Sequence, residues 1–329
     1  DTKTDTNSDL KINEIYGGSE LGSVNNIGVT NINIDGGIIG NVYGGGKGNN
    51  NVSPNTDGNI TVNMLNGDVN NIFGGNNIRG VIDTISTVNV SGGVIGNVYG
   101  GSDGTLLANS GGNINNVGAV NTLVNISGGT IETAVYGGGK SAPTTGSSTV
   151  NVTGGTFAQL DANGYLVTGT TPAEVFGGGE AARVTTTNVN ILAGANVYNV
   201  YGGSNKSGVV TTTNVNNTAG NILCNSYGGG KIAEAVTTNN NLNGTNYSYV
   251  LRDGETAYTT LCGSAFGGGA NANVTTANIT LNNGSMINVY GGSNEGGTVT
   301  RTNVSIKRGT VDNVFGGNNV GGTVGTSVV

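Results

Sequence analysis

The sequence predicts an all-β protein, a parallel β-solenoid of about eleven coils of about 25 residues each. Two observations carry this prediction. An aromatic residue followed by Gly-Gly occurs eleven times along the chain, and segments of alternating branched apolar and polar residues recur between these positions. No segment shows the 3.6-residue period of an amphipathic helix. We therefore expect the chain, residues 1–329, to form a single solenoid domain.

The aromatic positions define the repeat. Seven of the ten spacings between them fall between 24 and 30 residues, and three copies are longer. A period of about 20–50 residues is typical of solenoids, propellers and arrays. The aromatic positions are Tyr16, Tyr43, Phe73, Tyr99, Tyr136, Phe176, Tyr201, Tyr227, Phe266, Tyr290 and Phe315.

Each copy contains two strand-like segments. The first, such as NVNI at residues 188–191, alternates apolar and polar residues with the period of a half-buried strand. The second reads NV followed by the aromatic residue and Gly-Gly, as at residues 199–203. Glycine-containing turns separate the two segments. Two or three short strands without a helix fit one coil of a solenoid, whereas a propeller blade needs about 40–45 residues.

Stacking of such coils at about 4.8 Å predicts a rod roughly 50 Å long. A left-handed hexapeptide helix would need a six-residue period, which is not found, so we expect right-handed coils. Stacking also places equivalent residues in columns, in which asparagine amides can hydrogen-bond along the axis. The alternative is a row of amides that contacts a ligand. Asparagine stands two positions before the aromatic residue at Asn41, Asn71, Asn97, Asn199, Asn225, Asn288 and Asn313.

Two further columns follow from the same alignment. The polar residue within the first segment is asparagine at Asn33, Asn63, Asn89, Asn125, Asn151, Asn190, Asn216 and Asn241. The aromatic residues form the other column, either as a buried stack or as a surface stripe for sugars. Four of them are Phe, which has no polar tip, and this favours packing.

The three enlarged copies are expected to carry insertions: a loop near residues 102–118 and hairpins near residues 157–172 and 244–262. The hairpins are expected to project from one side of the rod, either to cover it or to bind a partner. Tyrosine beside a few charged residues suits recognition of carbohydrate or protein. The candidate ligand-binding residues are Tyr165, Tyr247, Tyr249, Arg252, Asp253, Glu255 and Tyr258.

The two cysteines fall on adjacent coils. Cys224 lies three residues before its aromatic residue, and Cys262 lies four before the next one. The resulting placement is compatible with a disulfide bond, and equally with two buried free thiols.

Composition and charge argue against several classes of function. The net charge is −7 and the lysines are scattered, which argues against a nucleic-acid surface. The chain contains no run of 18 apolar residues, so no segment is apolar enough to span a membrane as a helix. The chain has no histidine, so histidine-based triads and histidine-bound metals are absent. We expect no cofactor, no metal and no enzymatic activity.

With the NVYGG and TNVNI motifs, nearly the whole chain resembles the Gly/Asn/Thr-rich repetitive β-solenoid proteins of bacterial cell surfaces, which include adhesin stalks and extracellular fibre subunits. The resemblance implies export, so that the protein is expected to be extracellular, at the cell surface or secreted. It also implies a passive, rod-like role. No functional residue of a family can be transferred, because the motif is compositional and structural.

The expected partners are further copies of the chain stacked head to tail, or the rest of a longer stalk of the same chain. Surface carbohydrate or protein is a further expected partner. One alternative function is ice binding, because threonine runs such as residues 185–187 and 211–213 recur at one place in the repeat. Another is a carbohydrate-binding or polysaccharide-cleaving β-helix.

Overall fold

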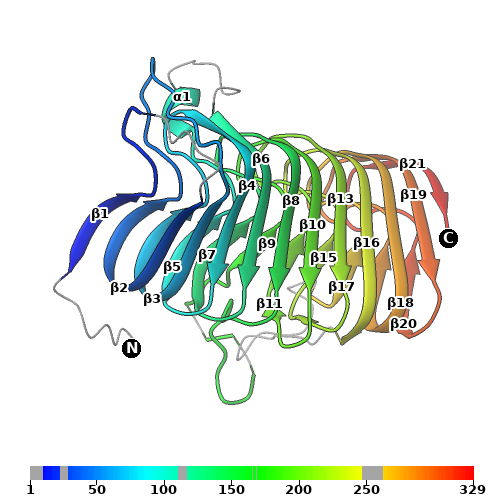
Figure 1. Cartoon of the computed structure of the whole chain (residues 1–329). Helices are drawn as coiled ribbons and strands as arrows, with labels where there is room; N and C mark the ends of the chain where they lie inside the picture. Colours follow the sequence, from blue (N-terminus) through cyan, green and yellow to red (C-terminus); the bar gives the residue numbers. More distant parts are fainter. Residues whose placement is uncertain (1–9, 23–28, 110–116, 165, 168, 247–261) are drawn as a thin grey trace.

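The computed structural model confirms the parallel β-solenoid (Figure 1). It describes residues 10–22, 29–109, 117–164, 166–167, 169–246 and 262–329. Figure 1 shows the strands as successive turns of one coil, running from the N-terminal end to the C-terminal end of a rod. The right-handed winding stays a prediction.

The elements follow the two-segment pattern of the repeat. The only helix in the described part of the chain is α1 (Thr105–Asn109). The strands are β1 (Lys11–Tyr16), β2 (Thr30–Tyr43), β3 (Ile60–Phe73), β4 (Gly80–Val90), β5 (Val94–Tyr99), β6 (Val117–Ile126), β7 (Thr130–Tyr136), β8 (Thr144–Val152), β9 (Glu174–Phe176), β10 (Val184–Ile191), β11 (Asn196–Val197), β12 (Asn199–Tyr201), β13 (Val210–Asn217), β14 (Asn221–Ile222), β15 (Ser226–Tyr227), β16 (Ala235–Asn246), β17 (Ser264–Phe266), β18 (Val274–Tyr290), β19 (Thr298–Ile306), β20 (Thr310–Phe315) and β21 (Thr323–Val328).

All the strand pairs between successive coils are parallel, and they keep the register of the repeat. The first segments pair in the order β4, β6, β8, β10, β13, β16, β18, β19 and β21. The second segments pair in the order β5, β7, β9, β12, β15, β17 and β18. The strands β2, β3 and β18 run through both segments of their coils. A separate pair, β11 with β14, lies between the segments.

The interior of the rod is filled by the apolar residues of both segments. Val189 and Val215 of the first segment, and Val175 and Val200 of the second, are fully buried. Burial of such a side chain contributes about 1.5–3 kcal/mol. The alternation seen in the sequence therefore separates a mainly apolar interior from a polar outer face, which is why the coils stack without a helix to cover them.

The aromatic residues form an unbroken buried stack along the rod. Successive ring centroids lie 4.6 to 5.1 Å apart, and the ring planes differ by at most 13°. Side chains within the stack are almost fully buried, such as Phe176 at 0% exposure and Tyr201 at 2%. The terminal Phe315 is 44% exposed. The column is therefore packing and not a surface stripe.

The first insertion differs from the expected loop because it contains the short helix α1. The backbone nitrogen of Thr105 donates to the Asp103 carboxylate over 3.2 Å at the start of the helix. Leu107 is buried against Val117 and Ala142, which holds the turn against the rod. Five residues are too few to display a helical period, so the pattern could not reveal this element.

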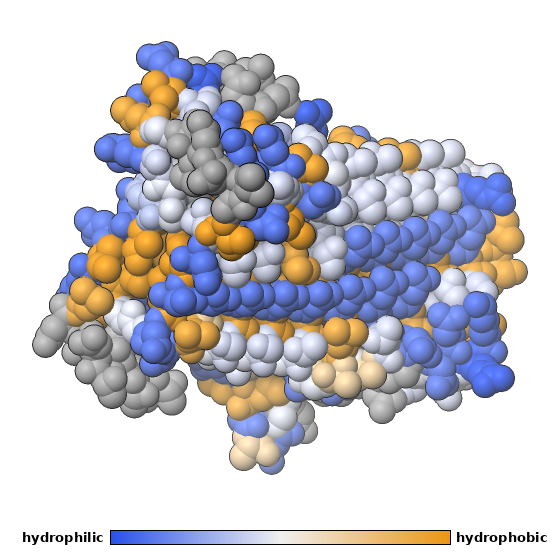
Figure 2. Space-filling model, in the orientation of Figure 1, coloured by the Kyte–Doolittle hydropathy of each residue, from blue (hydrophilic) through white to orange (hydrophobic). Residues whose placement is uncertain are grey.

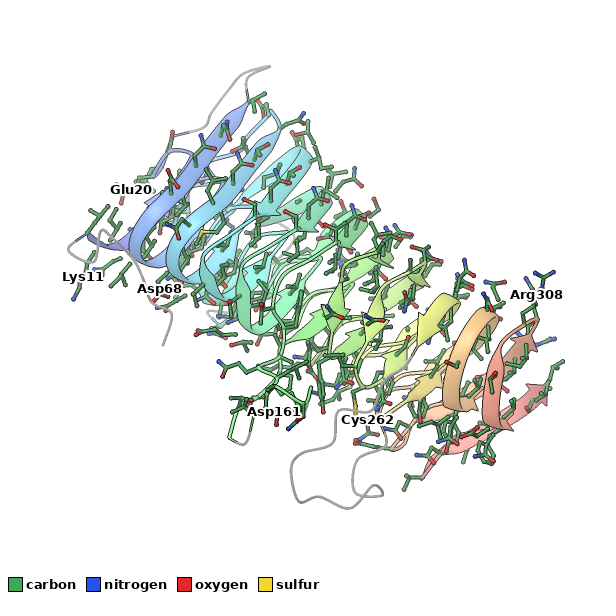
Figure 3. The ribbon with its side chains drawn as sticks, turned by 90° about the horizontal axis from the view of Figure 1, so that it is seen from below. Lys11, Glu20, Asp68, Asp161, Cys262 and Arg308 are labelled. Atoms are coloured by element: carbon green, nitrogen blue, oxygen red, sulfur yellow. A yellow bond between two sulfur atoms is a disulfide. The ribbon has the colours of Figure 1, made fainter. Side chains whose placement is uncertain are left out.

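The second insertion, from Phe157, projects from the rod as a narrow loop. Leu160 and Leu166 form an antiparallel bridge across it, and the nitrogen of Gly164 donates to the oxygen of Asp161 over 3.0 Å. Leu166 packs against Leu223, beside the rod. Figure 3 shows Asp161 at this insertion, and Cys262 at the border of the third insertion, on the same side of the molecule.

Two asparagines occupy interior positions where other coils have apolar residues. Asn240 is satisfied: its amide donates to the oxygen of Phe266 over 2.9 Å, and it accepts from the hydroxyl of Ser226 over 2.9 Å. Asn217 stands between Ile191 and Leu242 in the strand register. Its side-chain nitrogen is buried and has no hydrogen-bond partner among the described residues.

We expect Asn217→Leu to stabilise the protein by about 1 kcal/mol, since an unpaired buried amide costs about 1–3 kcal/mol. The gain is partly offset because the Asn217 oxygen accepts from the nitrogen of Gly220 over 3.1 Å. Thermal unfolding followed by circular dichroism measures the change. As a control, Asn240→Leu should lower the melting temperature because it leaves Ser226 unpaired. A lower melting temperature for Asn217→Leu would contradict the prediction.

Candidate functional site

The residues proposed as ligand-binding from the sequence lie outside the described part of the chain. Tyr165 belongs to the second insertion, and the others belong to the third. Their contribution to binding stays a prediction. The candidate residues of the third insertion are Tyr247, Tyr249, Arg252, Asp253, Glu255 and Tyr258.

The asparagines two positions before the aromatic residue make short ladders. Asn71 donates to Asn41 over 2.8 Å, and Asn97 donates to Asn71 over 3.1 Å. Near the C-terminal end, Asn313 donates to Asn288 over 3.0 Å. In the middle of the rod the pattern changes: Ala134, Glu174 and Ser264 replace asparagine in this column. Asn199 donates to Glu174 over 3.2 Å, and both Asn199 and Asn225 line the groove described below.

The first-segment asparagines form a ladder that is continuous over eight coils. Each amide nitrogen donates to the amide oxygen of the preceding coil over 2.8 to 3.1 Å, from Asn63 to Asn33 at one end and from Asn241 to Asn216 at the other. Figure 2 shows hydrophilic side chains as rows along the rod. These amides satisfy one another.

A second outer ladder was not singled out in the sequence. It runs from Asn188 to Asn303, with amide-to-amide distances of 2.7 to 3.1 Å. The sequence did contain a signal for this ladder. Asparagine is the first residue of the NVNI segment in these coils, and the ladder described before it uses the third residue. The two ladders together use the outer face of the first segments for contacts within the rod.

The threonine runs are divided between the interior and the surface. The third residue of each run points inward: Thr187 and Thr213 are fully buried, and Thr187 donates to the oxygen of Gly202 over 2.6 Å. The first residue faces solvent, but Val236 interrupts this outer row. Only some of the threonines on which the ice-binding alternative depends are therefore exposed to solvent. A thermal-hysteresis assay tests this alternative.

The two cysteines form a disulfide bond between adjacent coils. Their Cα atoms lie 4.2 Å apart, and the bond joins positions separated by 38 residues. The nitrogen of Gly263 donates to the oxygen of Cys224 over 2.8 Å, which keeps the two coils in register beside the bond. The disulfide thus closes off the third insertion at its base.

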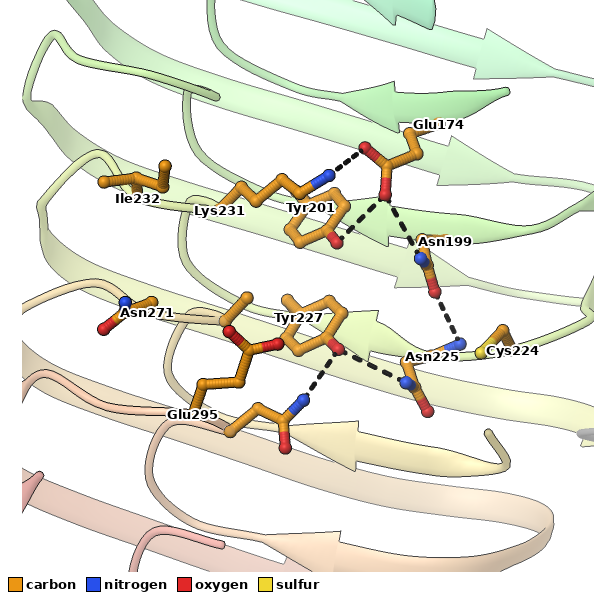
Figure 4. A pocket seen from close by; sticks show the side chains of 12 residues that line it. Glu174, Asn199, Tyr201, Cys224, Asn225, Tyr227, Lys231, Ile232, Asn271 and Glu295 are labelled. Atoms are coloured by element: carbon orange, nitrogen blue, oxygen red, sulfur yellow. Dashed lines mark hydrogen bonds and ion pairs between the residues drawn. The ribbon is translucent and has the colours of Figure 1, made fainter. Parts of the chain in front are cut away.

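A polar groove of about 460 Å³ lies along the second segments, beside the disulfide (Figure 4). It extends over five consecutive coils, from the coil of Phe176 to that of Tyr290. Twelve residues line it. They are Glu174, Asn199, Tyr201, Cys224, Asn225, Tyr227, Lys231, Ile232, Ala270, Asn271, Asn294 and Glu295.

One end of the groove is organised around Glu174. Lys231 pairs with this carboxylate over 2.7 Å, although the two residues are 57 positions apart. The hydroxyl of Tyr201 and the amide nitrogen of Asn199 each donate to it over 3.2 Å. The Lys231 nitrogen also lies 5.9 Å from the centroid of the Tyr201 ring. Figure 4 shows these three side chains converging on the carboxylate.

The other end of the groove is organised around Tyr227. Its hydroxyl accepts from the amide nitrogens of Asn225 and Asn294, each over 3.2 Å. All three side chains are at least nine-tenths buried. The Glu295 side chain points toward Tyr227 (Figure 4). Among the described residues, Glu295 forms no ion pair within 4.0 Å.

The tyrosine hydroxyls of the stack are held in their neutral form. Burial raises the pKa of the interior tyrosines above the ordinary value of 10.0, and hydrogen bonds to carboxylates add to the rise, as for Tyr99 with Glu180 and Tyr201 with Glu174. For Tyr227, burial outweighs the two asparagine donors, which lower the pKa. The same direction holds for Tyr43 and Tyr136.

We therefore expect alkaline unfolding. The stability from these tyrosines is fully present below pH 10, because both states then keep the proton. Above pH 10 the unfolded chain releases protons that the folded chain retains, and each such group lowers the free energy of unfolding by about 1.4 kcal/mol per pH unit. Absorbance at 295 nm should report ionisation of the stacked tyrosines together with loss of the β-sheet circular dichroism signal. Ionisation of the whole set near pH 10 with an intact fold would contradict this.

Sequence reasoning did not find the groove. Two of its charged residues, Glu174 and Lys231, come from coils that are two apart. One signal for the groove was present in the sequence. In the column two positions before the aromatic residue, Glu174 stands where the neighbouring coil has Asn199. No group of three or more Asp, Glu or Cys residues that could hold a metal ion occurs in the described segments. Likewise, none of the described helices is long and apolar enough to cross a membrane.

Comparison with known proteins gives no relative. Models of protein families, curated proteins and solved structures all yield no match to this chain. The functional proposals therefore depend on the geometry alone.

Proposed function

We propose that this protein is a non-catalytic structural rod, part of a fibre or adhesin at the cell surface. The observation that carries the proposal is the unbroken stack of eleven aromatic rings, with 4.6 to 5.1 Å between successive centroids. An uninterrupted stack resists bending and compression, since interiors packed in this way have low compressibility. The aromatic stack and the asparagine ladders both use the repeated side chains for contacts between neighbouring coils. A protein that serves as a spacer needs such contacts within the rod.

The disulfide supports an extracellular location. Structural disulfides persist in oxidising compartments and are rare in the cytosol of mesophiles. Cys224 and Cys262 are 5% exposed, so the bond is protected from exchange. The largely uncharged polar surface of Asn, Thr and Ser is consistent with this location.

The axial faces of the rod support stacking on further coils. At the C-terminal face, Phe315 is 44% exposed, Val320 71% and Val329 74%. Phe315 ends the aromatic column and Val329 stands over the buried Val304, so both belong to columns that are buried elsewhere in the rod, whereas Val320 stands over the exposed Glu295. The columns can continue into further coils of the same chain or into a second copy stacked head to tail.

Cryo-electron microscopy of the purified chain over a concentration series tests both parts of the proposal. The homopolymer predicts filaments that lengthen with concentration and show an axial repeat of about 4.8 Å. Separate short rods at every concentration would overturn the homopolymer and retain the stalk. Particles that are not rod-shaped would overturn the structural role itself.

A further inference from the structure

We propose that the groove around Tyr227 binds a neutral or amine-bearing oligosaccharide. The residues that line it come from the repeat itself, and the proposal does not depend on whether the rods assemble. The argument uses four properties of the groove: an unused hydroxyl donor, an unused carboxylate acceptor, its charge, and its length.

The donor is the hydroxyl of Tyr227. Two amides, from Asn225 and Asn294, donate to its oxygen. A phenolic oxygen that accepts two hydrogen bonds still carries its own hydrogen. No acceptor for this hydrogen lies within hydrogen-bond distance among the described residues, and the side chain lines the groove at 3% exposure. A buried polar group without a partner favours a ligand that supplies one.

The acceptor is the Glu295 carboxylate. It lines the same groove and points toward Tyr227 (Figure 4). Its negative charge adds to the rise in the pKa of Tyr227, after the larger effect of burial. A ligand that satisfies both must accept a hydrogen bond from one and donate to the other. Neighbouring hydroxyls of a sugar ring do both, because each hydroxyl donates and accepts.

Charge separates the classes of sugar. The ion pair between Glu174 and Lys231 neutralises both of these charges. Glu295 then leaves the groove with one negative charge. A uronic acid would place a second negative charge in the groove that holds Glu295, and like charges repel. A neutral or amino sugar avoids this repulsion.

The shape of the groove fits an oligosaccharide. Five coils at about 4.8 Å spacing extend over about 19 Å, which is longer than one sugar ring. The volume of about 460 Å³ falls within the range of small-molecule sites. Ile232 is 57% exposed at the rim, and Ala270 is an apolar lining residue. They provide a surface for the apolar face of a ring.

Binding to an array of neutral, amino and uronic-acid oligosaccharides tests the proposal, followed by calorimetry with the strongest binder. The variants are Tyr227→Phe and Glu295→Gln. Phenylalanine already occupies the column at Phe176 and Phe266, so the fold should tolerate the first variant. Tyr136→Phe is the matched control, because its hydroxyl accepts from Asn205 outside the groove. Circular dichroism verifies that each variant is folded.

We expect binding to neutral or amino oligosaccharides and none to uronic acids. Each of the two groove variants should raise the Kd about tenfold, and Tyr136→Phe should leave it within about twofold. The proposal is overturned if no oligosaccharide binds, if only uronic acids bind, or if either groove variant leaves the Kd unchanged.

Discussion

Replacing Phe176 by alanine is expected to lower the free energy of unfolding by about 3–5 kcal/mol. The ring is fully buried and lies between Tyr136 and Tyr201, at centroid distances of 5.1 and 4.7 Å. Alanine removes both stacking contacts and leaves a cavity inside the rod. The interior can collapse only a little, because the backbone hydrogen bonds between coils hold the spacing of the rings. Chemical denaturation measures the loss.

Phe315→Ala is the control for this variant. Phe315 occupies the same column but stacks on Tyr290 alone, and it is 44% exposed. Its replacement should cost well under half as much. Equal losses for the two variants would contradict the prediction, because Phe315 buries less area and stacks on one ring only.

Gly203→Ala is expected to destabilise the rod by about 1–3 kcal/mol or more, because it overpacks the contact between adjacent coils. A Cβ atom on Gly203 would lie 2.7 Å from the backbone nitrogen of Gly230 and 2.9 Å from its Cα. Both contacts are with backbone, which cannot rotate away. The coils would have to separate locally, and the hydrogen bond from the nitrogen of Gly203 to the oxygen of Gly229 would weaken.

Gly317 holds the same position in its coil and offers a matched control. No atom lies within 4 Å of a Cβ built on it. Gly317→Ala should therefore be neutral, or stabilise by up to about 1 kcal/mol through the reduced freedom of the unfolded chain. Melting temperatures of the two variants test the prediction. A large loss at Gly317 would show that backbone conformation, rather than the space between coils, requires glycine here.

The regular columns could be predicted because a repeat places equivalent residues one above the other. Once the aromatic residues were aligned, the pairing of Tyr201 with Tyr227 and of Asn190 with Asn216 followed from the parallel register. Such contacts depend only on the coil-to-coil spacing. The alignment did not decide whether the rings form a buried stack or a surface stripe. The four phenylalanines favoured a buried stack, which the structure shows.

Features outside the repeat could not be predicted in this way. The helix at residues 105–109 is too short for a periodic signal, and its position depends on Leu107 reaching Val117 and Ala142. The threonine run at residues 185–187 reads as one uniform row, yet Thr187 continues the inward alternation of Val189 and Ile191 and is buried, whereas Thr185 faces solvent. The place where the alternation begins decides which of these side chains meet solvent.

The sequence by itself determined the solenoid, its parallel register and the columns of stacked side chains, because these follow from period and alternation. Only the tertiary structure decided which side chains meet across different columns. Lys231 reaches Glu174 over two coils, and Asn294 reaches Tyr227 over 67 positions. Such contacts depend on the direction and length of individual side chains and on the coils between them. A linear pattern does not contain that information, so the groove emerged only from the folded rod.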